Sequence, residues 1–521
     1  MEARHSPPPW HIRIGVTLCL LILSLTLLTL RALTSYLRRV RKTNSTRRQR
    51  LLKQLNLPAE NAAARQTVIG FFHPYCNAGG GGERVLYEAI RYHLAADKHT
   101  VCVVYTGDAT AGGSATKSEI LIKARDRFSI DLTSPHSSSR LAFLPLRSRL
   151  LVSDSYWSRL TILGQSFGGA ILAKEACEEL LPDVFIDTMG YAFAYPVVRL
   201  FRPSTPVGAY VHYPTVSADM LARVKGRATG HTNDAKVAKS MLRSQIKLVY
   251  YRLFAKVYAW ALRRADVLVA NGTWTMRHLN TLLGGHGRSA TTVYPPCDTR
   301  SLEGFPLSGR KPTLVSLAQF RPEKEQATQL RLLRALFDLR PSLRDDGVRL
   351  IVMGSSRNPS DEARVASLRR LASELDIASQ VEFVVNAPWP TVVSHLSTAS
   401  VGLSTMVDEH FGMNVVEFMA AGLITLSHAS AGPLLDIVVP DEKGRATGFH
   451  ATDVDDFAKK AQHVLCRMSE GERDEMRGRA RRRAQQVFNA TAFEEAWRGR
   501  LWEPLEGKLK ALRDRDVKKK Q

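Results

Sequence analysis

Asp408-Glu-His-Phe-Gly-Met-Asn-Val-Val-Glu-Phe-Met-Ala-Ala-Gly422 predicts a short helix held between two buried strands. The apolar runs Val401–Met406 and Leu423–Ser427 flank it, and Gly422 is a natural helix stop. Four apolar side chains would form the packing face of the helix: Val415, Val416, Phe418 and Met419. A strand–loop–helix–strand unit aims the helix N-terminus at the carboxyl edge of a parallel sheet. There the free backbone N–H groups and the helix dipole favour an anionic ligand such as a diphosphate.

Two carboxylates of this stretch, Glu409 and Glu417, have seven residues between them, and Gly412 is one of these. Glu409 would lie just before the helix and Glu417 about one turn inside it, so both could flank one ligand. The simpler alternative is a surface helix with two solvated glutamates. The flanking strands, the glycine in the loop and Ala431-Gly-Pro433 downstream favour the ligand site.

The surrounding sequence predicts an α/β protein with two doubly wound, Rossmann-like parallel domains. In the second domain, strands are expected at 313–320, 349–355, 381–385, 401–406 and 423–427, and helices near 324–339, 361–375, 390–398 and 413–421. In the first domain, the expected strands include Thr67–Phe72, Val101–Tyr105, Pro182–Thr188 and Pro206–Tyr213. At 521 residues the chain is long enough to bury two cores.

Four consecutive glycines follow the first expected strand and precede Glu83-Arg84 and a helix: Gly79, Gly80, Gly81 and Gly82. Glycines let the backbone approach a ligand closely, with the helix N-terminus behind it. The pattern is not the dinucleotide fingerprint, because Arg84 stands where the last glycine belongs, and it is not a Walker motif. The alternative is a plain flexible loop.

Two further groups of polar residues lie at expected strand ends. His212 lies near the end of Pro206–Tyr213, where it would face the ligand edge of the sheet, although a lone histidine is more often structural. Gln319-Phe-Arg-Pro-Glu-Lys324 ends the first strand of the second domain. The guanidinium of Arg321 and the ammonium of Lys324 would suit diphosphate binding and neutralisation of a leaving group.

The formal net charge is +24, and residues 1–53 alone contribute +10 of it. Ile14–Leu30 is a 17-residue run without a charge, at the short end of the range for a transmembrane helix. Two arginines precede this run and nine Lys or Arg residues follow it by residue 53, so the positive-inside rule predicts a lumenal N-terminus and a cytosolic body. The basic segment would then lie against anionic headgroups. No nucleic-acid-binding motif accompanies the charge, and a membrane-tethered nucleic-acid binder is the alternative.

Two segments mix apolar, aromatic and polar residues, namely Asp154–Leu180 and Ile246–Leu262. Each could lie in a membrane interface or pack as an ordinary helix. The polar residues 225–240 are expected to form a mobile loop. The six cysteines are scattered without a CxxC pair, so neither a zinc site nor a disulfide framework is predicted.

Glu-x7-Glu with Phe-Gly inside it resembles the signature of retaining glycosyltransferases of the GT-B type (glycosyltransferase family 4), which have two Rossmann-like domains facing a cleft. Three more segments are similar to the GDP-mannose-dependent α-1,2-mannosyltransferases that assemble dolichol-linked oligosaccharides for asparagine-linked glycosylation: residues 71–86, 210–215 and 319–324. The resemblance spans roughly residues 68–490. One departure is clear, because Gln319 takes the position of the usual arginine, Arg321 is displaced by two, and Lys324 falls on the lysine position.

The resemblance implies retaining, metal-independent transfer of mannose from GDP-mannose, without a cofactor, to Man3GlcNAc2-diphosphate-dolichol. It implies addition of the fourth and fifth mannoses on the cytosolic face of the endoplasmic reticulum. The implied partners are the two substrates, membrane lipids of the endoplasmic reticulum and other mannosyltransferases there, but no nucleic acid. Retaining glycosidases use a carboxylate nucleophile. The sequence identifies none, so front-face attack by the acceptor hydroxyl, assisted by the leaving phosphate, is expected.

The same resemblance implies a role for each motif residue. Glu417 would hold the donor ribose and Glu409 would contact the transferred mannose. Lys324, with Arg321, would stabilise the departing GDP, and His212 would contact the sugar and the transition state. The sugar and diphosphate would be bound by the backbone of four residues: Phe411, Gly412, Met413 and Asn414. The loop of Gly79, Gly80, Gly81 and Gly82 would border the acceptor.

The expected organisation of the chain has six parts. These are a lumenal tail at 1–12, a transmembrane anchor at 13–33, a basic juxtamembrane segment at 34–66, an N-terminal acceptor domain at 67–309, a C-terminal GDP-mannose domain at 310–485, and a C-terminal helix with a basic tail at 486–521. Two alternatives stay open at this level. One is another lipid-directed GT-B transferase with a different sugar or linkage, and the other is a non-catalytic transferase-like subunit.

Overall fold

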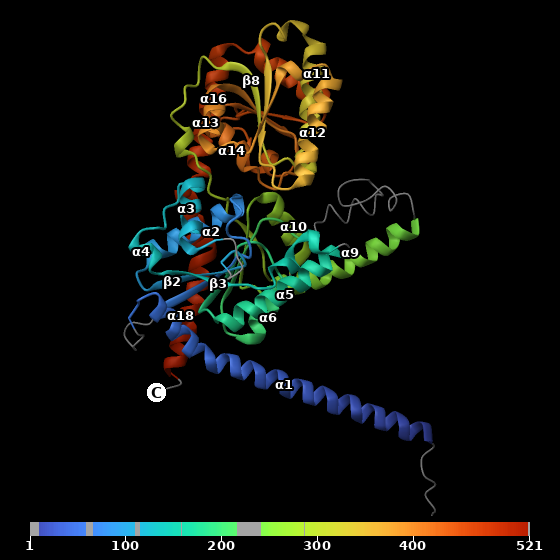
Figure 1. Ribbon diagram of the computed structural model, residues 1–521, viewed down its shortest axis with the longest axis vertical. Coiled ribbons are helices and arrows are strands. Elements are labelled where there is room, and N and C mark those ends of the chain that lie inside the picture. The colour runs from blue at the N-terminus through green and yellow to red at the C-terminus, as the bar shows by residue number, and fades with distance from the viewer. Residues whose placement is uncertain are drawn as a thin grey trace, which may run out of the picture.

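The structure, a computed structural model, describes residues 10–58, 66–109, 115–157, 159–215, 241–285 and 287–518. The predicted loop at 225–240 lies outside these residues. Figure 1 shows two α/β domains stacked end to end, with a long N-terminal helix leaving the first of them. The prediction of two Rossmann-like domains with parallel sheets is confirmed.

The N-terminal domain has a seven-stranded parallel sheet in the order β3-β2-β1-β4-β5-β6-β7. Its strands are β1 (Thr67–Phe72), β2 (Thr100–Thr106), β3 (Leu141–Pro145), β4 (Val184–Asp187), β5 (Val207–Val211), β6 (Val267–Ala270) and β7 (Thr291–Thr292). The accompanying α-helices are α2 (Gly81–Ala96), α3 (Lys117–Phe128), α4 (Pro135–Ser138), α5 (Thr161–Glu179), α6 (Ala194–Phe201), α9 (Met241–Leu262) and α10 (Thr273–Leu283). Because helices cover both faces, β1 and β2 are buried along their whole length. The strand order reverses between β1 and β4, which makes their carboxyl ends a topological switch point.

The C-terminal domain has a six-stranded parallel sheet in the order β10-β9-β8-β11-β12-β13. Its strands are β8 (Lys311–Leu317), β9 (Arg349–Gly354), β10 (Val381–Val385), β11 (Ala399–Ser404), β12 (Ile424–His428) and β13 (Phe449–Ala451). Its α-helices are α11 (Gln326–Leu339), α12 (Pro359–Glu374), α13 (Trp389–Thr398), α14 (Met413–Ala421), α15 (Val454–Gln462) and α16 (Glu470–Val487). All five predicted strands and four predicted helices are present, with ends that differ by three residues or fewer. The second switch point lies between β8 and β11.

The chain then returns to the first domain through α17 (Ala490–Trp497) and α18 (Glu503–Lys518). Trp497, Leu501 and Leu505 are fully buried among residues of the N-terminal sheet and α2. The Trp497 indole donates to Nε2 of His93 on α2 at 3.1 Å. Figure 1 shows α18 running beside the N-terminal domain, so the C-terminal tail ties the two domains together.

The N-terminal helix α1 (Trp10–Gln54) runs without a break through the apolar run and most of the basic segment. Its described apolar part is long and apolar enough to cross a membrane, and no residue of this part is buried in the protein. Its second half contacts α5 and α6, and its Leu37, Val40, Leu51 and Leu52 are buried in the core of the N-terminal domain. Arg48 in this half pairs with the buried Asp183 at 2.8 Å. The expectation that the basic segment as a whole lies against headgroups is therefore wrong for Arg48, because packing turns this side of α1 toward the protein.

Candidate active site

The carboxyl edges of the two sheets face one cleft of about 1050 Å³. Each switch point contributes to it, because residues after β8 and β11 line one wall and residues after β5 and β6 line the other. The cleft brings together all of the site residues singled out in the sequence: Gly79, Gly80, Gly81, Gly82, His212, Arg321, Lys324, Glu409, Phe411, Gly412, Met413, Asn414 and Glu417. Segments more than 300 residues apart in the chain therefore form one candidate site.

Helix α14 presents its N-terminus to this cleft, as the apolar pattern predicts. Val415, Val416, Phe418 and Met419 are fully buried against the sheet, and Gly422 ends the helix in the left-handed conformation with φ +80°. Gly412 forms the N-cap with φ +105°, where a side chain would strain the backbone, and it offers no capping group of its own. The first N–H groups of α14 are thus directed at the cleft, which suits an anion.

Lys324 and Glu409 form a close ion pair at the C-terminal switch point. The Lys324 ammonium lies 2.6 Å from Oε2 of Glu409 and 3.2 Å from the sulfur of Met406. Lys324 closes the short helical turn after β8, and Glu409 belongs to the loop after β11, so two adjacent strand ends supply the pair. A cation held by a carboxylate beside a helix N-terminus can neutralise charge that develops on a leaving phosphate.

Arg321 is placed less favourably than Lys324 for binding a phosphate in the cleft. Its guanidinium is about half exposed, and the carboxylate of Glu323 lies 3.9 Å away. Both cations line the cleft, but of the two only Lys324 is more than three-quarters buried and paired with Glu409.

Glu417 lies on α14 with its carboxylate in the cleft, where it keeps some contact with solvent although protein surrounds it. Burial raises the pKa of Glu417 to about 7, opposed by the positive charges of Arg84 and Arg127 from the N-terminal domain and reinforced by Asp298. Arg84 in turn lies 3.7 Å from Asp298. The carboxylate therefore changes its charge near neutral pH, so its role can be tested by varying the pH.

If Glu417 accepts hydroxyl protons from the donor ribose, it must be ionised to do so well. We expect kcat/KM for GDP-mannose to fall as pH drops below about 7, approaching about tenfold for each further pH unit, because the neutral fraction of the free enzyme rises. Initial rates at subsaturating GDP-mannose between pH 5.5 and 8.5 would measure this. Glu417→Gln should bind the donor more weakly and show a flat profile in this range. Loss of activity in Glu417→Ala with unchanged donor affinity would refute the ribose role.

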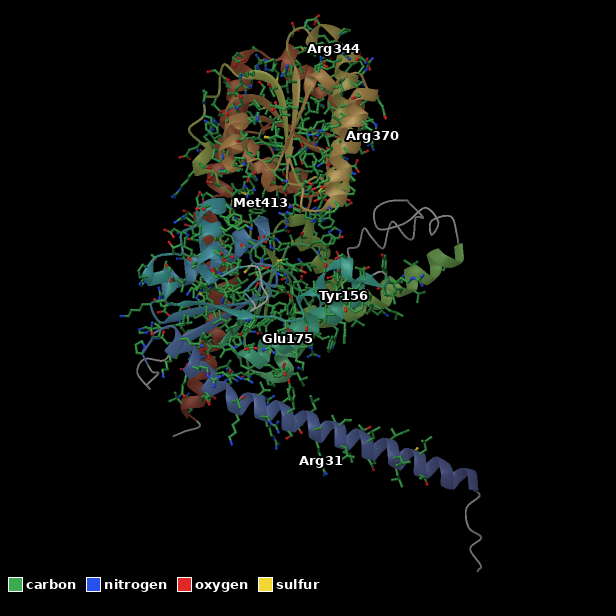
Figure 2. All side chains as sticks on the ribbon, viewed as in Figure 1. Arg31, Tyr156, Glu175, Arg344, Arg370 and Met413 are labelled. Atoms are coloured by element: carbon green, nitrogen blue, oxygen red, sulfur yellow. The ribbon has the colours of Figure 1, made fainter. Side chains whose placement is uncertain are left out.

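His212 lines the cleft directly after the end of β5. Its Nε2–H donates to the carbonyl of Thr188 at 3.1 Å, and burial lowers its pKa to about 4, so the ring is neutral at physiological pH. A neutral imidazole fixed in one tautomer can accept a hydrogen bond from a sugar hydroxyl at Nδ1. Figure 2 labels Met413, the first residue of α14, at the junction of the two domains.

The glycine loop approaches α14 from the other side of the cleft. A Cβ atom added to Gly81 would lie 2.5 Å from the sulfur of Met413, and one added to Gly82 would lie 3.5 Å from Nε2 of His212. Glu83 accepts the N–H groups of Ala78 at 3.1 Å and Gly80 at 2.9 Å, so the loop is held by its own carboxylate. The absence of side chains thus permits a close approach of the loop to the donor wall.

Several cleft residues were not identified from the sequence. In the N-terminal domain Asn271 follows β6 just as His212 follows β5, and its buried Oδ1 has no hydrogen-bond partner among the residues that the structure describes. The sequence feature that could have identified Asn271 is its position directly after a strand. Across the cleft, the Arg127 guanidinium lies over the Trp389 ring at 5.3 Å. No local pattern marks that pair, because its members belong to different domains.

Two family models and several named relatives match this chain. Residues 66–283 match the family described as "ALG11 mannosyltransferase N-terminus", and residues 299–486 match "Glycosyl transferases group 1". The chain is 44% identical over 420 residues to the human protein named "GDP-Man:Man(3)GlcNAc(2)-PP-Dol alpha-1,2-mannosyltransferase", covering 80% of this chain and 83% of that one. The Dictyostelium discoideum protein of the same name is 40% identical over 404 residues, covering 76% and 77%.

Solved structures support the fold. A trehalose 6-phosphate synthase from Burkholderia multivorans superposes with a TM-score of 0.59 at 11% identity, covering 87% of this chain and all of that one. The Anabaena protein Alr3699/HepE in complex with UDP and glucose superposes with a TM-score of 0.53 at 15% identity, covering 82% and 97%.

Proposed function

The chain belongs to the GDP-Man:Man(3)GlcNAc(2)-PP-Dol alpha-1,2-mannosyltransferase family, and from this premise we propose how its cleft performs the reaction. The enzyme is a glycosyltransferase that moves mannose from GDP-mannose to Man3GlcNAc2-diphosphate-dolichol through an α-1,2 linkage. It adds the fourth and fifth mannoses, with retention of configuration, on the cytosolic face of the endoplasmic reticulum. The observation that carries the mechanism is the Lys324–Glu409 pair beside the N-terminus of α14.

Donor binding uses the C-terminal wall of the cleft. The diphosphate lies against the N–H groups at the start of α14 and the Lys324 ammonium, and Glu417 accepts hydrogen bonds from the ribose hydroxyls. Glu409 accepts hydrogen bonds from hydroxyls of the mannose. In this proposal the anomeric carbon of the sugar faces the opposite wall of the cleft, which His212 lines.

Transfer proceeds on the face of the sugar from which the phosphate leaves. The glycosidic C–O bond to the GDP phosphate breaks, the acceptor 2-hydroxyl oxygen bonds to the anomeric carbon, and the departing phosphate oxygen takes the hydroxyl proton. Lys324 and the α14 dipole stabilise the charge that grows on the phosphate. No metal ion is needed in this scheme, because protein cations supply that charge; activity that EDTA leaves unchanged is the expected result.

The test is a transfer assay on the purified full chain in detergent. GDP-mannose and a lipid-diphosphate Man3GlcNAc2 acceptor are supplied without added metal, and the product is analysed by mass and by α-1,2-mannosidase digestion. Gain of two hexoses that the mannosidase removes would establish donor, acceptor and linkage together. No transfer, with equal GDP-mannose binding by wild type and Glu409→Ala, would support a non-catalytic subunit or a different donor.

The membrane arrangement is part of the proposal. We place α1 across the membrane of the endoplasmic reticulum as a single span with the body in the cytosol, supported by its exposed apolar part and by the basic residues that follow it. A second apolar surface lies on α5, α9 and the residue before α5, and we name it the α5–α9 apolar surface. Its exposed members are Leu160, Leu163, Phe167, Val249, Leu253, Val257 and Trp260. Tyr251 and Leu248 of α9 pack with Ile162 of α5, so the two parts are adjacent.

The four members on α9 recur every three or four residues and therefore share one helix face. We propose that this face dips into the cytosolic leaflet beside α1 and holds the cleft near the lipid-linked acceptor. In liposomes with brominated acyl chains, Trp260 fluorescence of the full chain should be quenched, and Trp260→Phe should remove that quenched component. Trp389→Phe is the matched control, because Trp389 lies in the cleft. Equal quenching before and after Trp260→Phe would place this face in water.

A further inference from the structure

Helix α10 of the N-terminal domain begins at the cleft without a capping side chain of its own. Its N-cap residue is Gly272, which makes no side-chain hydrogen bond. Helices usually satisfy their first N–H groups through a Ser, Thr, Asp or Asn at this position. In α10 the side chain that accepts the first N–H group comes instead from the C-terminal domain.

Asp436 of the C-terminal domain supplies the cap. Its Oδ2 accepts the N–H of Thr273, the first residue of α10, at 2.8 Å, and its Oδ1 accepts the hydroxyl of Tyr294 at 3.0 Å. The residue is 1% exposed, so the bond is shielded from water. Gly272 leaves room for this approach, because a Cβ atom there would lie 3.0 Å from Oδ2 of Asp436 and 3.3 Å from the carbonyl oxygen of His410.

The first turn of α10 connects this cap to both walls of the active site. On the N-terminal side, the Thr275 hydroxyl donates to the carbonyl of His212 at 3.4 Å. On the C-terminal side, the Trp274 ring lies 5.0 Å from the ring of His410, the neighbour of Glu409. The His410 ring also contacts Tyr213, the neighbour of His212, at 4.2 Å.

The loop that carries Glu409 is held on its other side by the segment that carries Asp436. The N–H of Gly432 donates to the carbonyl of Glu409 at 2.9 Å, and a Cβ atom at Gly432 would lie 2.3 Å from the carbonyl oxygen of Phe411. Arg483 of α16 fixes the segment from behind by donating to the carbonyls of Asp436 and Ile437. Asp436 thus sits in a rigid part of the C-terminal domain.

We propose that Asp436 is a positioning residue that fixes the position of one wall of the cleft relative to the other. Its carboxylate caps α10 across the domain boundary, and α10 in turn holds His212 opposite the Glu409 loop. The inference rests on the proposed function, in which His212 and Glu409 act on the same mannosyl group. Donor binding needs only the C-terminal wall, whereas transfer needs both walls, so the two should separate when the cap is lost.

The test compares Asp436→Ala and Asp436→Asn with wild type in the transfer assay, using the full chain. For Asp436→Ala we expect kcat to fall on the order of 10- to 100-fold, because small misplacements of reacting groups are costly. KM for GDP-mannose should change less than about threefold, since Lys324, Glu409 and Glu417 stay in place. Asp436→Asn should recover part of kcat, because the amide oxygen can still accept the Thr273 N–H.

Asp453→Ala is the matched control. Asp453 caps α15 of the same domain by accepting the Asp456 N–H at 2.9 Å, and it does not line the cleft. Its loss should lower thermal stability like any cap while leaving kcat unchanged. Wild-type kcat in Asp436→Ala, or an equal loss of kcat in Asp453→Ala, would overturn the proposal. An inactive wild type would instead refute the proposed function, so the two failures are distinguishable.

Discussion

Replacement of Lys324 by alanine is expected to lower kcat for mannose transfer about 10²- to 10³-fold, the usual cost of removing one group that stabilises charge in the transition state. The ammonium lies at the C-terminal switch point, beside the N-terminus of α14 and 2.6 Å from Glu409. Without it, the negative charge of Glu409 faces the departing phosphate unopposed, which adds repulsion to the lost attraction. The steady-state rate with saturating GDP-mannose and lipid acceptor measures the effect.

Arg321→Ala provides the matched control for this prediction. It removes a cation three residues away that also borders the cleft, but its side chain is about half exposed and its charge is screened by water. We expect a loss of kcat of less than about tenfold, since an exposed charge contributes little. Equal losses in the two variants would mean that the positive potential of the cleft, and not the position of Lys324, drives departure of GDP.

The role of Lys324 can be separated from support of Glu409 by a double-mutant cycle. If Lys324 acts only by orienting Glu409, the change Lys324→Ala should have little further effect in the Glu409→Ala background. If it acts on the phosphate, most of its effect should persist there. We expect persistence, because in the proposed mechanism Lys324 stabilises the departing phosphate directly.

Residues at the candidate site were predictable where a short stretch of chain determines their place. The strand, the loop with Gly412 and the apolar face of α14 follow from residues 401–427 alone, and each strand end exposes its next residues at the same sheet edge. For that reason the sequence assigns Lys324 and Glu409 to the carboxyl edge of the second sheet and His212 to the carboxyl edge of the first. Two edge strands, β3 and β13, were not predicted. Strand β13 has only three residues, which carry little pattern, whereas the edge strand β10, as long as β3, was predicted.

Contacts between the two domains could not be predicted from local sequence patterns. The bond between Asp436 and Thr273 joins residues 163 apart, and the pair Arg127–Trp389 spans the open side of the cleft. Nothing in the spacing of either segment specifies how two separate sheets approach each other. The packing of α1 was hidden for a different reason, because its buried Leu37, Val40, Leu51 and Leu52 are interspersed with basic residues that suggest a solvated or lipid-facing helix.

Replacement of Asp183 by alanine is expected to lower the local stability of the α1 attachment by about 3–5 kcal/mol, the usual cost of leaving one member of a buried ion pair unpaired. Asp183 is 3% exposed, and its Oδ2 accepts from Arg48 at 2.8 Å and from the N–H of Val68 at 2.9 Å. One carboxylate therefore joins α1 to the first strand of the sheet. Hydrogen exchange of residues 37–54 in the full chain would measure the opening free energy.

Two variants make this prediction specific. The exposed pair of Arg334 and Asp338, 2.9 Å apart on α11, is the control, and Asp338→Ala should cost less than about 1 kcal/mol. The double variant Arg48→Met with Asp183→Leu should regain only part of the lost stability. It removes the unpaired buried charge, but the buried N–H of Val68 still lacks the acceptor that Asp183 provides.

The attachment of α1 also bears on catalysis, because it sets how the cleft is oriented above the lipid. A loosened α1 would leave GDP-mannose binding intact and raise KM for the lipid-linked acceptor in liposomes, while a water-soluble acceptor analogue should be used as well as before. If Asp183→Ala loosens α1 in hydrogen exchange but leaves KM for the lipid acceptor unchanged, the anchor serves only to retain the enzyme at the membrane. In that case the α5–α9 apolar surface, rather than α1, would have to orient the cleft toward its acceptor.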